Sequence, residues 1–506
     1  MKKWVAMLVF SLSVCQLAYT QTNKFDNIWF IGGIGGNADN MRLLFNGIGV
    51  APVIVPVNVI SNPLYIGGHS NICDTNGNLL FSTDGFSIFD NNCNMLQNGD
   101  SLISREYHIG VGGGNSLSQT SIILPFPNKK YYVFTPSVSD SIFINEWQAQ
   151  TAFRFDELFY HIVDMNANGG MGAVVRKKVQ ILKNKELNLT NMMACRHGNG
   201  KDWWLFKQAK DTNMVYKFLV TEDSVYNYGV QGFAEPHFWL LDNFGQAMFN
   251  QDASQYAICV QGGGGYDTSG PSASPGNIFV ADFDRCTGEL SNPIVYQTKK
   301  SLCSNMDPNC FENFNQGLCF SPNGRFLYVS SYYSIKQLDL WDTDTTTQWS
   351  YVFGLKMDGY FGSLYNAPDG KIYVGNTSNG YKAMTVIDSP DVKGMGCSVC
   401  YKCLAFPDYG VSSPPCMPNY HLGAKVPCWP LAIDEQIVDK NVLEVFPNPS
   451  STVFYIKNKN GKKKELYNAI GELIFTTFKE EIEVKHIAKG MYYIRCEGLS
   501  KKVVVE

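Results

Sequence analysis

Short β-forming segments, each preceded by a tight polar turn, recur along most of the chain between Phe25 and Cys428. Asn-Gly and Asp-Gly dipeptides accept positive φ at low cost, and the aromatic and β-branched residues that follow suit a pleated, half-buried surface. Each copy therefore predicts a hairpin. Six copies occur, at residues 76–81, 128–134, 199–206, 253–258, 322–329 and 368–374.

A unit of roughly 40–50 residues with several short strands is typical of a β-propeller blade. An ordinary sandwich with repeated hairpins is the alternative, but six copies of one turn-and-strand phrase favour the propeller. We predict an all-β domain over residues 21–428 with about seven blades. The seventh blade would combine Asn27–Gly32 with the last strands before Cys428, which joins the two ends of the domain.

Composition agrees with a globular protein of more than one domain. The chain has 506 residues, of which 45% are hydrophobic and 17% charged. The formal net charge is -4 and no basic patch stands out, so we expect no nucleic-acid partner. No stretch beyond the N-terminus is apolar enough for a span, so we expect no transmembrane segment in the mature protein.

The first 20 residues have the pattern of an export signal. Lys2 and Lys3 form a positive n-region, Trp4–Ala18 a short apolar region, and Ala18 and Thr20 place small residues before a cleavage site. We predict a signal peptide over residues 1–20. A lipoprotein signal at Cys15 is the alternative, although the preceding Val14 is bulky for that motif.

The cysteines predict disulfides. The chain has 15 cysteines, and loss of Cys15 with the signal leaves an even number in an exported protein. Sequence proximity suggests pairing of Cys73 with Cys93 and of Cys303 with Cys310. A further candidate cluster comprises Cys397, Cys400, Cys403, Cys416 and Cys428.

The same cluster also has the spacing of an iron–sulfur or zinc site. Cys397, Cys400 and Cys403 lie three residues apart, and Cys416 or Cys428 would supply a fourth ligand. Disulfides are favoured because metal thiolates compete poorly with oxidation outside the cytoplasm. We therefore predict no metal and no cofactor.

The hydrophobic alternation changes character at the end of the chain. Residues 429–441 predict a linker, since 433–441 are mostly polar, and short alternating strands return over residues 442–506. Turns at Gly461, Gly471 and Gly490 separate these strands. The pattern predicts a small Ig-like β-sandwich.

This last segment resembles a type A C-terminal sorting domain of the bacterial type IX secretion system. The residues that carry the resemblance are Pro447, Asn448, Pro449, Gly471, Gly490, Tyr492, Lys501 and Lys502. The resemblance implies recognition by the outer-membrane translocon and its sorting machinery. It also implies that the protein reaches the cell surface or the medium.

The long middle resembles propellers of the WD40-like or YVTN-like kind in large secreted Bacteroidetes proteins. The resemblance rests on phrases such as Asn27–Gly32, Gly77–Gly85, Lys130–Thr135, Asp282–Ser291 and Ala367–Val374. It implies a fold and little about activity, because one scaffold serves many tasks.

No local pattern assembles a catalytic set, so a non-enzymatic propeller that binds a glycan or a protein is the favoured function. Exposed aromatics at Trp203–Trp204, Tyr332–Tyr333 and Tyr360–Phe361 are candidates for contact with a ligand, and core packing between blades is the alternative for each pair. A lactonase-like or polysaccharide-degrading propeller enzyme is the alternative function.

Overall fold

The protein forms two compact units that divide between Trp429 and Pro430. The computed structural model describes residues 23–33, 40–57, 65, 67–111, 115–232, 245–260, 264–267, 270–273, 277–297, 315–354, 361–376, 381–411, 413–425, 428, 443, 445–457, 461–468, 472–496 and 499–506. The predicted signal peptide (1–20) and linker (429–441) lie outside these residues.

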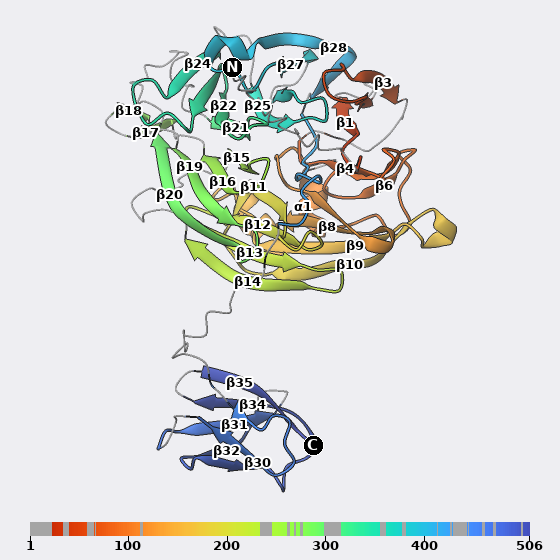
Figure 1. Cartoon of the computed structure of the whole chain (residues 1–506). Helices are drawn as coiled ribbons and strands as arrows, with labels where there is room; N and C mark the ends of the chain where they lie inside the picture. The colour runs from red at the N-terminus through yellow and green to blue at the C-terminus, as the bar shows by residue number, and fades with distance from the viewer. Residues whose placement is uncertain are drawn as a thin grey trace, which may run out of the picture. The chain divides into compact units, whose positions relative to one another are not determined.

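The first unit is a β-propeller, as the sequence predicts (Figure 1). Within the described residues its strands form seven blades, and β1 (Ile28–Gly33) and β28 (Val399–Val411) join the first and the seventh into one seven-stranded sheet. The first two have three strands each: β1 (Ile28–Gly33), β2 (Asn40–Leu44) and β3 (Val53–Val57), then β4 (Ser70–Cys73), β5 (Leu79–Thr83) and β6 (Ile88–Asp90). The third has four: β7 (Ile122–Phe126), β8 (Lys130–Ser137), β9 (Glu157–Asp164) and β10 (Ala173–Leu182).

The other four blades also have four strands each. The fourth blade comprises β11 (Leu187–Arg196), β12 (Trp203–Ala209), β13 (Met214–Val220) and β14 (Val225–Gly232). The fifth comprises β15 (Gly245–Phe249), β16 (Gln255–Val260), β19 (Asn277–Asp284) and β20 (Glu289–Gln297), with a side hairpin of β17 (Gly264–Asp267) and β18 (Gly270–Ala273). The sixth comprises β21 (Asn315–Phe320), β22 (Phe326–Ser331), β23 (Ser334–Asp339) and β24 (Trp349–Gly354). The seventh comprises β25 (Phe361–Asn366), β26 (Ile372–Asn376), β27 (Tyr381–Ile387) and β28 (Val399–Val411).

The six repeated phrases all lie at one structural position, the turn between the first and second strands of six consecutive blades. Gly200 and Gly324 occupy this turn with φ of 73° and 74°, a left-handed conformation that a side chain disfavours. Asn128 and Ala253 hold the corresponding turns with φ of 58° and 53°. The repeat seen in the sequence is therefore the turn at the inner edge of each blade.

The two ends of the propeller are joined through their backbones. Gly32 and Gly33 of β1 pair with Val411 and Gly410 of β28, so the first strand of the domain meets its last. The aromatic rings of Trp29 and Tyr373 lie 5.6 Å apart across the same junction. Closure of the ring protects inner strand edges that an open sheet would expose.

Helical segments of this unit are short. They are α1 (Arg105–Val111), α2 (Asp140–Ile142), η1 (Pro127–Lys129), η2 (Phe143–Trp147), η3 (Asn168–Gly170) and η5 (Gly394–Cys397). None of the helices in the described part of the chain is long and apolar enough to cross a membrane.

The second unit is the predicted β-sandwich. One sheet has the order β29 (Val445–Phe446), β30 (Val453–Ile456) and β33 (Glu481–Glu483). The other has the order β32 (Leu473–Thr477), β31 (Lys464–Asn468), β34 (Gly490–Cys496) and β35 (Leu499–Val505). Alternate residues of these strands enclose a core of its own, which includes Phe454, Leu466, Ile494 and Val503.

Candidate functional site

The opening and closing motifs of the C-terminal unit lie side by side. The side-chain amide of Asn448 donates from Nδ2 to the Lys502 carbonyl (2.9 Å), and its Oδ1 accepts from the Val504 amide (2.9 Å). Ser450 continues the contact, because its amide donates to the Val504 carbonyl and its carbonyl accepts from Glu506. The segment around Asn448 therefore covers the free edge of β35, and Pro447 and Pro449 flank the amide that makes this contact.

The other predicted sorting residues lie on the sheet that contains β34 and β35. Tyr492 points inward, 8% exposed, and its hydroxyl donates to the Ala488 carbonyl (2.7 Å). Gly490 begins β34, while Lys501 and Lys502 lie exposed on β35. Gly471 falls outside the described residues.

In the propeller, a segment without regular secondary structure occupies the axis of the ring. We call residues 413–425 the central strap. It touches several blades: Ser413 lies 3.4 Å from Ser363 of β25, the Cys416 carbonyl accepts from Ser70 of β4, and Tyr420 donates to the Ile123 carbonyl of β7. Asn419 also donates to the Gln251 carbonyl, in the turn after β15. One segment reaches these strands only by running between them, as its blue trace in Figure 1 indicates.

Polar side chains of the inner strands also cross the axis. Gln119 forms two hydrogen bonds with Ala247 of β15 (2.7 and 2.9 Å). Gln246 of β15 accepts from the amides of Leu318 and Leu364 in the next two blades. Both glutamines are fully buried. The middle of the propeller is therefore closed by the protein's own groups.

Burial of this region shifts the ionisation of His69, which lies between the strap and the first blade. Its carbonyl accepts from the Cys416 amide (2.8 Å), and its Nε2 lies 2.9 Å from the Phe30 carbonyl. Burial away from water disfavours the imidazolium and lowers the pKa of His69 to about 4. The imidazole is consequently neutral at physiological pH.

The structure pairs the cysteines differently from the sequence expectation. Cys428 bonds Cys286, and Cys400 bonds Cys403, with Cα–Cα distances of 5.1 and 5.6 Å. Cys286 was not among the candidates, because it lies 142 residues from its partner and no local spacing marks it. Cys303 and Cys310 lie outside the described residues.

The remaining candidate cysteines are buried free thiols. Cys73 and Cys93 are free thiols buried in one small apolar cluster with Phe30, Tyr65 and Leu79. Cys397 and Cys416 are also free and buried, and burial raises the pKa of Cys416 to about 12. Among the described residues, no group of three or more His, Cys, Asp or Glu side chains is arranged to hold a metal.

The aromatic pairs singled out in the sequence pack into the fold. Trp203 and Trp204 are 0% and 1% exposed, and their indole nitrogens donate to the carbonyls of Pro125 and Arg285. Tyr333 and Phe361 are 7% and 3% exposed. Packing between blades accounts for these residues, and Tyr360 lies outside the described part.

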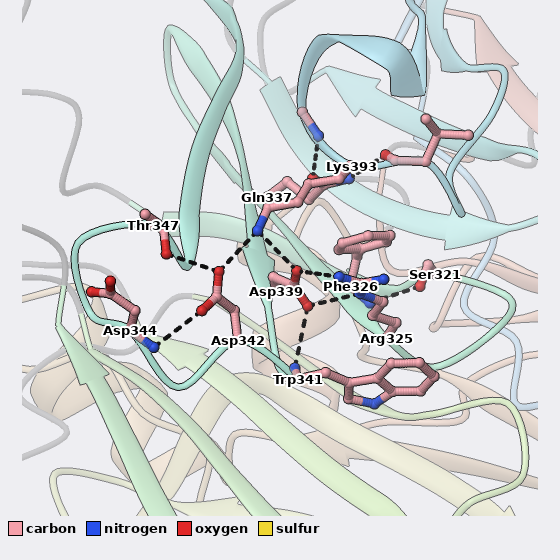
Figure 2. Close-up of polar contacts among 12 residues, drawn as sticks. Ser321, Arg325, Phe326, Gln337, Asp339, Trp341, Asp342, Asp344, Thr347 and Lys393 are labelled. Atoms are coloured by element: carbon pink, nitrogen blue, oxygen red, sulfur yellow. Dashed lines mark hydrogen bonds and ion pairs between the residues drawn. The ribbon is translucent and has the colours of Figure 1, made fainter.

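One exposed aromatic that the sequence interpretation missed is Trp341, in the turn between β23 and β24. Its side chain is 68% exposed. Figure 2 shows the indole beside the Arg325 guanidinium, whose central carbon lies 5.4 Å from the ring centroid. The strand ends at Asp339, and a Trp two residues beyond it, directly before the polar run Asp342–Thr347, was the available signal of exposure.

A buried carboxylate holds this aromatic platform in place. Asp339, 1% exposed, accepts from Arg325 through both oxygens (2.9 and 2.8 Å) and from the Trp341 amide (3.2 Å). Lys393, from the neighbouring blade, lies 3.1 Å from Asp339 and 2.9 Å from Asp342 (Figure 2). The hydrogen bonds from Arg325, more than any other contact, lower the pKa of Asp339 to about 2. The Asp339 carboxylate therefore stays ionised at neutral pH.

Comparison with known families identifies the C-terminal unit. Residues 444–506 match the model of a secretion system C-terminal sorting domain. The family predicted from the motifs, the type IX sorting domain, is confirmed, and this tail marks the chain for export. No curated protein sequence matches the chain.

Solved structures similar to this chain have low identity to it. A candidate 6-phosphogluconolactonase from Bacteroides uniformis is 11% identical, with a TM-score of 0.42, and the match covers 77% of this chain and 98% of that one. AztD from Citrobacter koseri is 13% identical, with a TM-score of 0.38, covering 77% and 86%. The β-propeller domain of Cps50 (Swd1) from Myceliophteria thermophila is 10% identical, with a TM-score of 0.29, covering 77% and 98%.

Proposed function

We propose that this chain is a carbohydrate-binding protein that the type IX secretion system delivers to the cell surface or the medium. The sorting tail directs the export of the chain, and the propeller is the binding module. The observation that carries the binding proposal is the exposed, rigidly supported indole of Trp341.

The closed axis directs the search for a ligand to the outer faces of the propeller. The central strap, Gln119 and Gln246 fill the middle of the ring with buried groups. A ligand there would have to displace packed side chains and several hydrogen bonds, each of which costs free energy to break. An exposed turn such as the one at Trp341 carries no such cost.

The chemistry around Trp341 suits a sugar ring. An aromatic face offers apolar contact to the C–H side of a pyranose, and nearby charged groups offer hydrogen bonds to its hydroxyls. Asp342 follows Trp341 in the chain and pairs with Lys393, and their side chains are 20% and 41% exposed. The bond from the Trp341 amide to Asp339 and the stacked Arg325 pre-organise the platform, which lowers the entropic cost of binding.

The test is a glycan array probed with the purified full chain and with Trp341→Ala. We expect at least about a tenfold loss of affinity for the bound glycans, as for the loss of an aromatic anchor. Tyr226→Ala is the matched control, because Tyr226 is a 51% exposed aromatic on the outer strand of another blade. Equal binding by wild type and Trp341→Ala would contradict the proposal.

Delivery is tested separately by deletion of residues 443–506. We expect the truncated chain to accumulate in the periplasm of its native host, while the intact chain reaches the surface or the medium. Normal export of the truncated chain would contradict the role of the tail.

A further inference from the structure

The four-stranded sheet of the sorting domain has an outer face with unusual composition. Pairing across β32, β31, β34 and β35 places Leu473, Tyr467, Tyr493 and Lys502 in one row. Tyr493 belongs to the exposed side of β34, since its neighbours Tyr492 and Ile494 point into the core. The row therefore lies on the outer face, and we call these four residues the outer band.

Large apolar side chains on this face remain exposed. Leu473 is 51% exposed, Tyr493 is 42% exposed, and the adjacent Met491 is 48% exposed. A neighbouring row adds Arg495, opposite Glu465 on β31 and Ser500 on β35. Exposed Tyr and Met side chains with an Arg beside them are residue types enriched in protein interfaces.

The other sheet of the sandwich differs in charge. Its exposed positions on β33 are Glu481 and Glu483, which lie opposite Tyr455 and Val453 of β30. On the four-stranded sheet Lys502 gives the outer band a positive charge, and Glu465 balances Arg495 in the neighbouring row, whereas the β33 side carries two exposed carboxylates. A partner with acidic groups around an apolar surface matches the outer band and is repelled by the β33 side.

The motif formed by Pro447, Asn448 and Pro449 supports the four-stranded sheet that carries the outer band. Asn448 bonds the Lys502 carbonyl and the Val504 amide, so it supports the edge of β35 that faces away from β34, while the β34–β35 ladder places Lys502 opposite Tyr493. The same contact covers the edge of β35, so a partner cannot add a strand there. We therefore assign the motif around Asn448 a role in forming the sheet, and we assign recognition to the exposed face of that sheet.

We infer that the outer band, Leu473, Tyr467, Tyr493 and Lys502, is the surface by which the secretion machinery reads this tail, through an acidic, partly apolar site. This inference rests on the proposed delivery by the tail. It assigns Asn448 as a positioning residue and the band as the contact surface.

The experiment compares export of full-length variants in the native host, with the unfolding temperature of each purified chain as a second readout. Tyr493→Ala and Lys502→Glu remove the centre and the charge of the band. We expect the exported fraction to fall about tenfold for each, as when an interface anchor is lost, with little change in unfolding temperature. Lys502 is exposed, so its substitution leaves the core intact.

Two matched controls lie off the band in the turn after β32. Phe478→Ala removes a 61% exposed aromatic, and Lys479→Glu reverses an exposed charge. Both should be exported normally. Normal export of Tyr493→Ala and Lys502→Glu, alongside retention of the chain that lacks residues 443–506, would overturn the inference alone. Export of the truncated chain would instead overturn the proposed delivery.

Discussion

The propeller and the sorting domain are each completed by their last segment, by opposite means. The central strap (413–425) is irregular and buried along most of its length, and it holds the ring through side chains such as Ser70 and Tyr420. The terminal strand β35 is regular, and it is held by a backbone ladder on one edge and by Asn448 on the other.

This difference explains why only one of the two segments has a readable motif. The contacts of β35 require a short local arrangement, an amide between two prolines, which stays recognisable in any chain that uses it. The contacts of the strap come from inner strands hundreds of residues apart. Many residue types satisfy such contacts as long as the ring is closed, so no compact pattern results.

We expect the central strap to contribute strongly to the free energy of unfolding of the propeller, because its side chains complete the core. Tyr420 is 1% exposed, its ring centroid lies 5.8 Å from that of Phe25 and 6.0 Å from that of Trp203, and its hydroxyl bonds Ile123. We expect Tyr420→Ala to lower the free energy of unfolding by about 3–5 kcal/mol, from lost packing and a cavity. Tyr420→Phe should lose only about 1 kcal/mol, the value of one hydrogen bond. Urea titration measures both, and equal small losses would show that the strap is peripheral.

The disulfide at the end of the strap should matter more than the local one. Cys286 and Cys428 are separated by 142 residues, and Cys400 and Cys403 by three. Because a longer closed loop restricts the unfolded chain more, Cys428→Ser should cost about 2–4 kcal/mol, and Cys400→Ser clearly less. Denaturant midpoints of the two single variants test this, and a larger effect for Cys400→Ser would contradict it.

Acid should distinguish the two units, because the propeller buries His69 and the sorting domain leaves His486 exposed. The folded pKa of His69 is about 4, below the ordinary 6.5, so on acidification the unfolded state binds a proton first. Stability from this group is present above pH 6.5 and is lost towards pH 4, by up to about 1.4 kcal/mol per pH unit.

The measurement is the free energy of unfolding of the propeller between pH 4 and pH 7, for the wild type and for His69→Gln. The variant should show a shallower slope, whatever its absolute stability. Buried His161, with a pKa lowered to about 3 by burial, preserves part of the trend in both proteins. Identical slopes for the wild type and for His69→Gln would mean that protonation of His69 does not contribute to the pH dependence of stability.

The smallest effect is expected at the edge of β35. Asn448→Ala removes two hydrogen bonds near solvent, and we expect the sorting domain to lose about 1–2 kcal/mol. Asn448→Asp keeps the acceptor for Val504 and loses the donor to Lys502, so its loss should be intermediate. Calorimetry that resolves the two units provides the measurement, and a loss confined to the propeller transition would contradict the assignment.

Much of the fold was predictable because it depends on local chemistry repeated many times. In turns such as Asn323–Gly324 the glycine accepts positive φ, and the aromatic and β-branched residues that follow form strands such as β22, which is buried at every position. The candidate site was less predictable. Aromatic residues such as Trp203 and Trp204 are common in binding surfaces, yet here they are buried against other parts of the propeller. Their burial depends on residues far along the chain, such as Arg285, whose carbonyl accepts from Trp204.

By itself the sequence determined the all-β class, the repeated blade turn and the sorting tail, since each is carried by residues close together in the chain. Tertiary structure alone decided that residues 413–425 would close the axis, that Cys428 would bond Cys286, and that Trp341 would stay exposed on a buried Asp339. These outcomes depend on distances between segments that meet only when the ring closes. The physical reason is that burial and pairing belong to the whole assembly of blades, whereas turns and strand alternation belong to a few neighbouring residues.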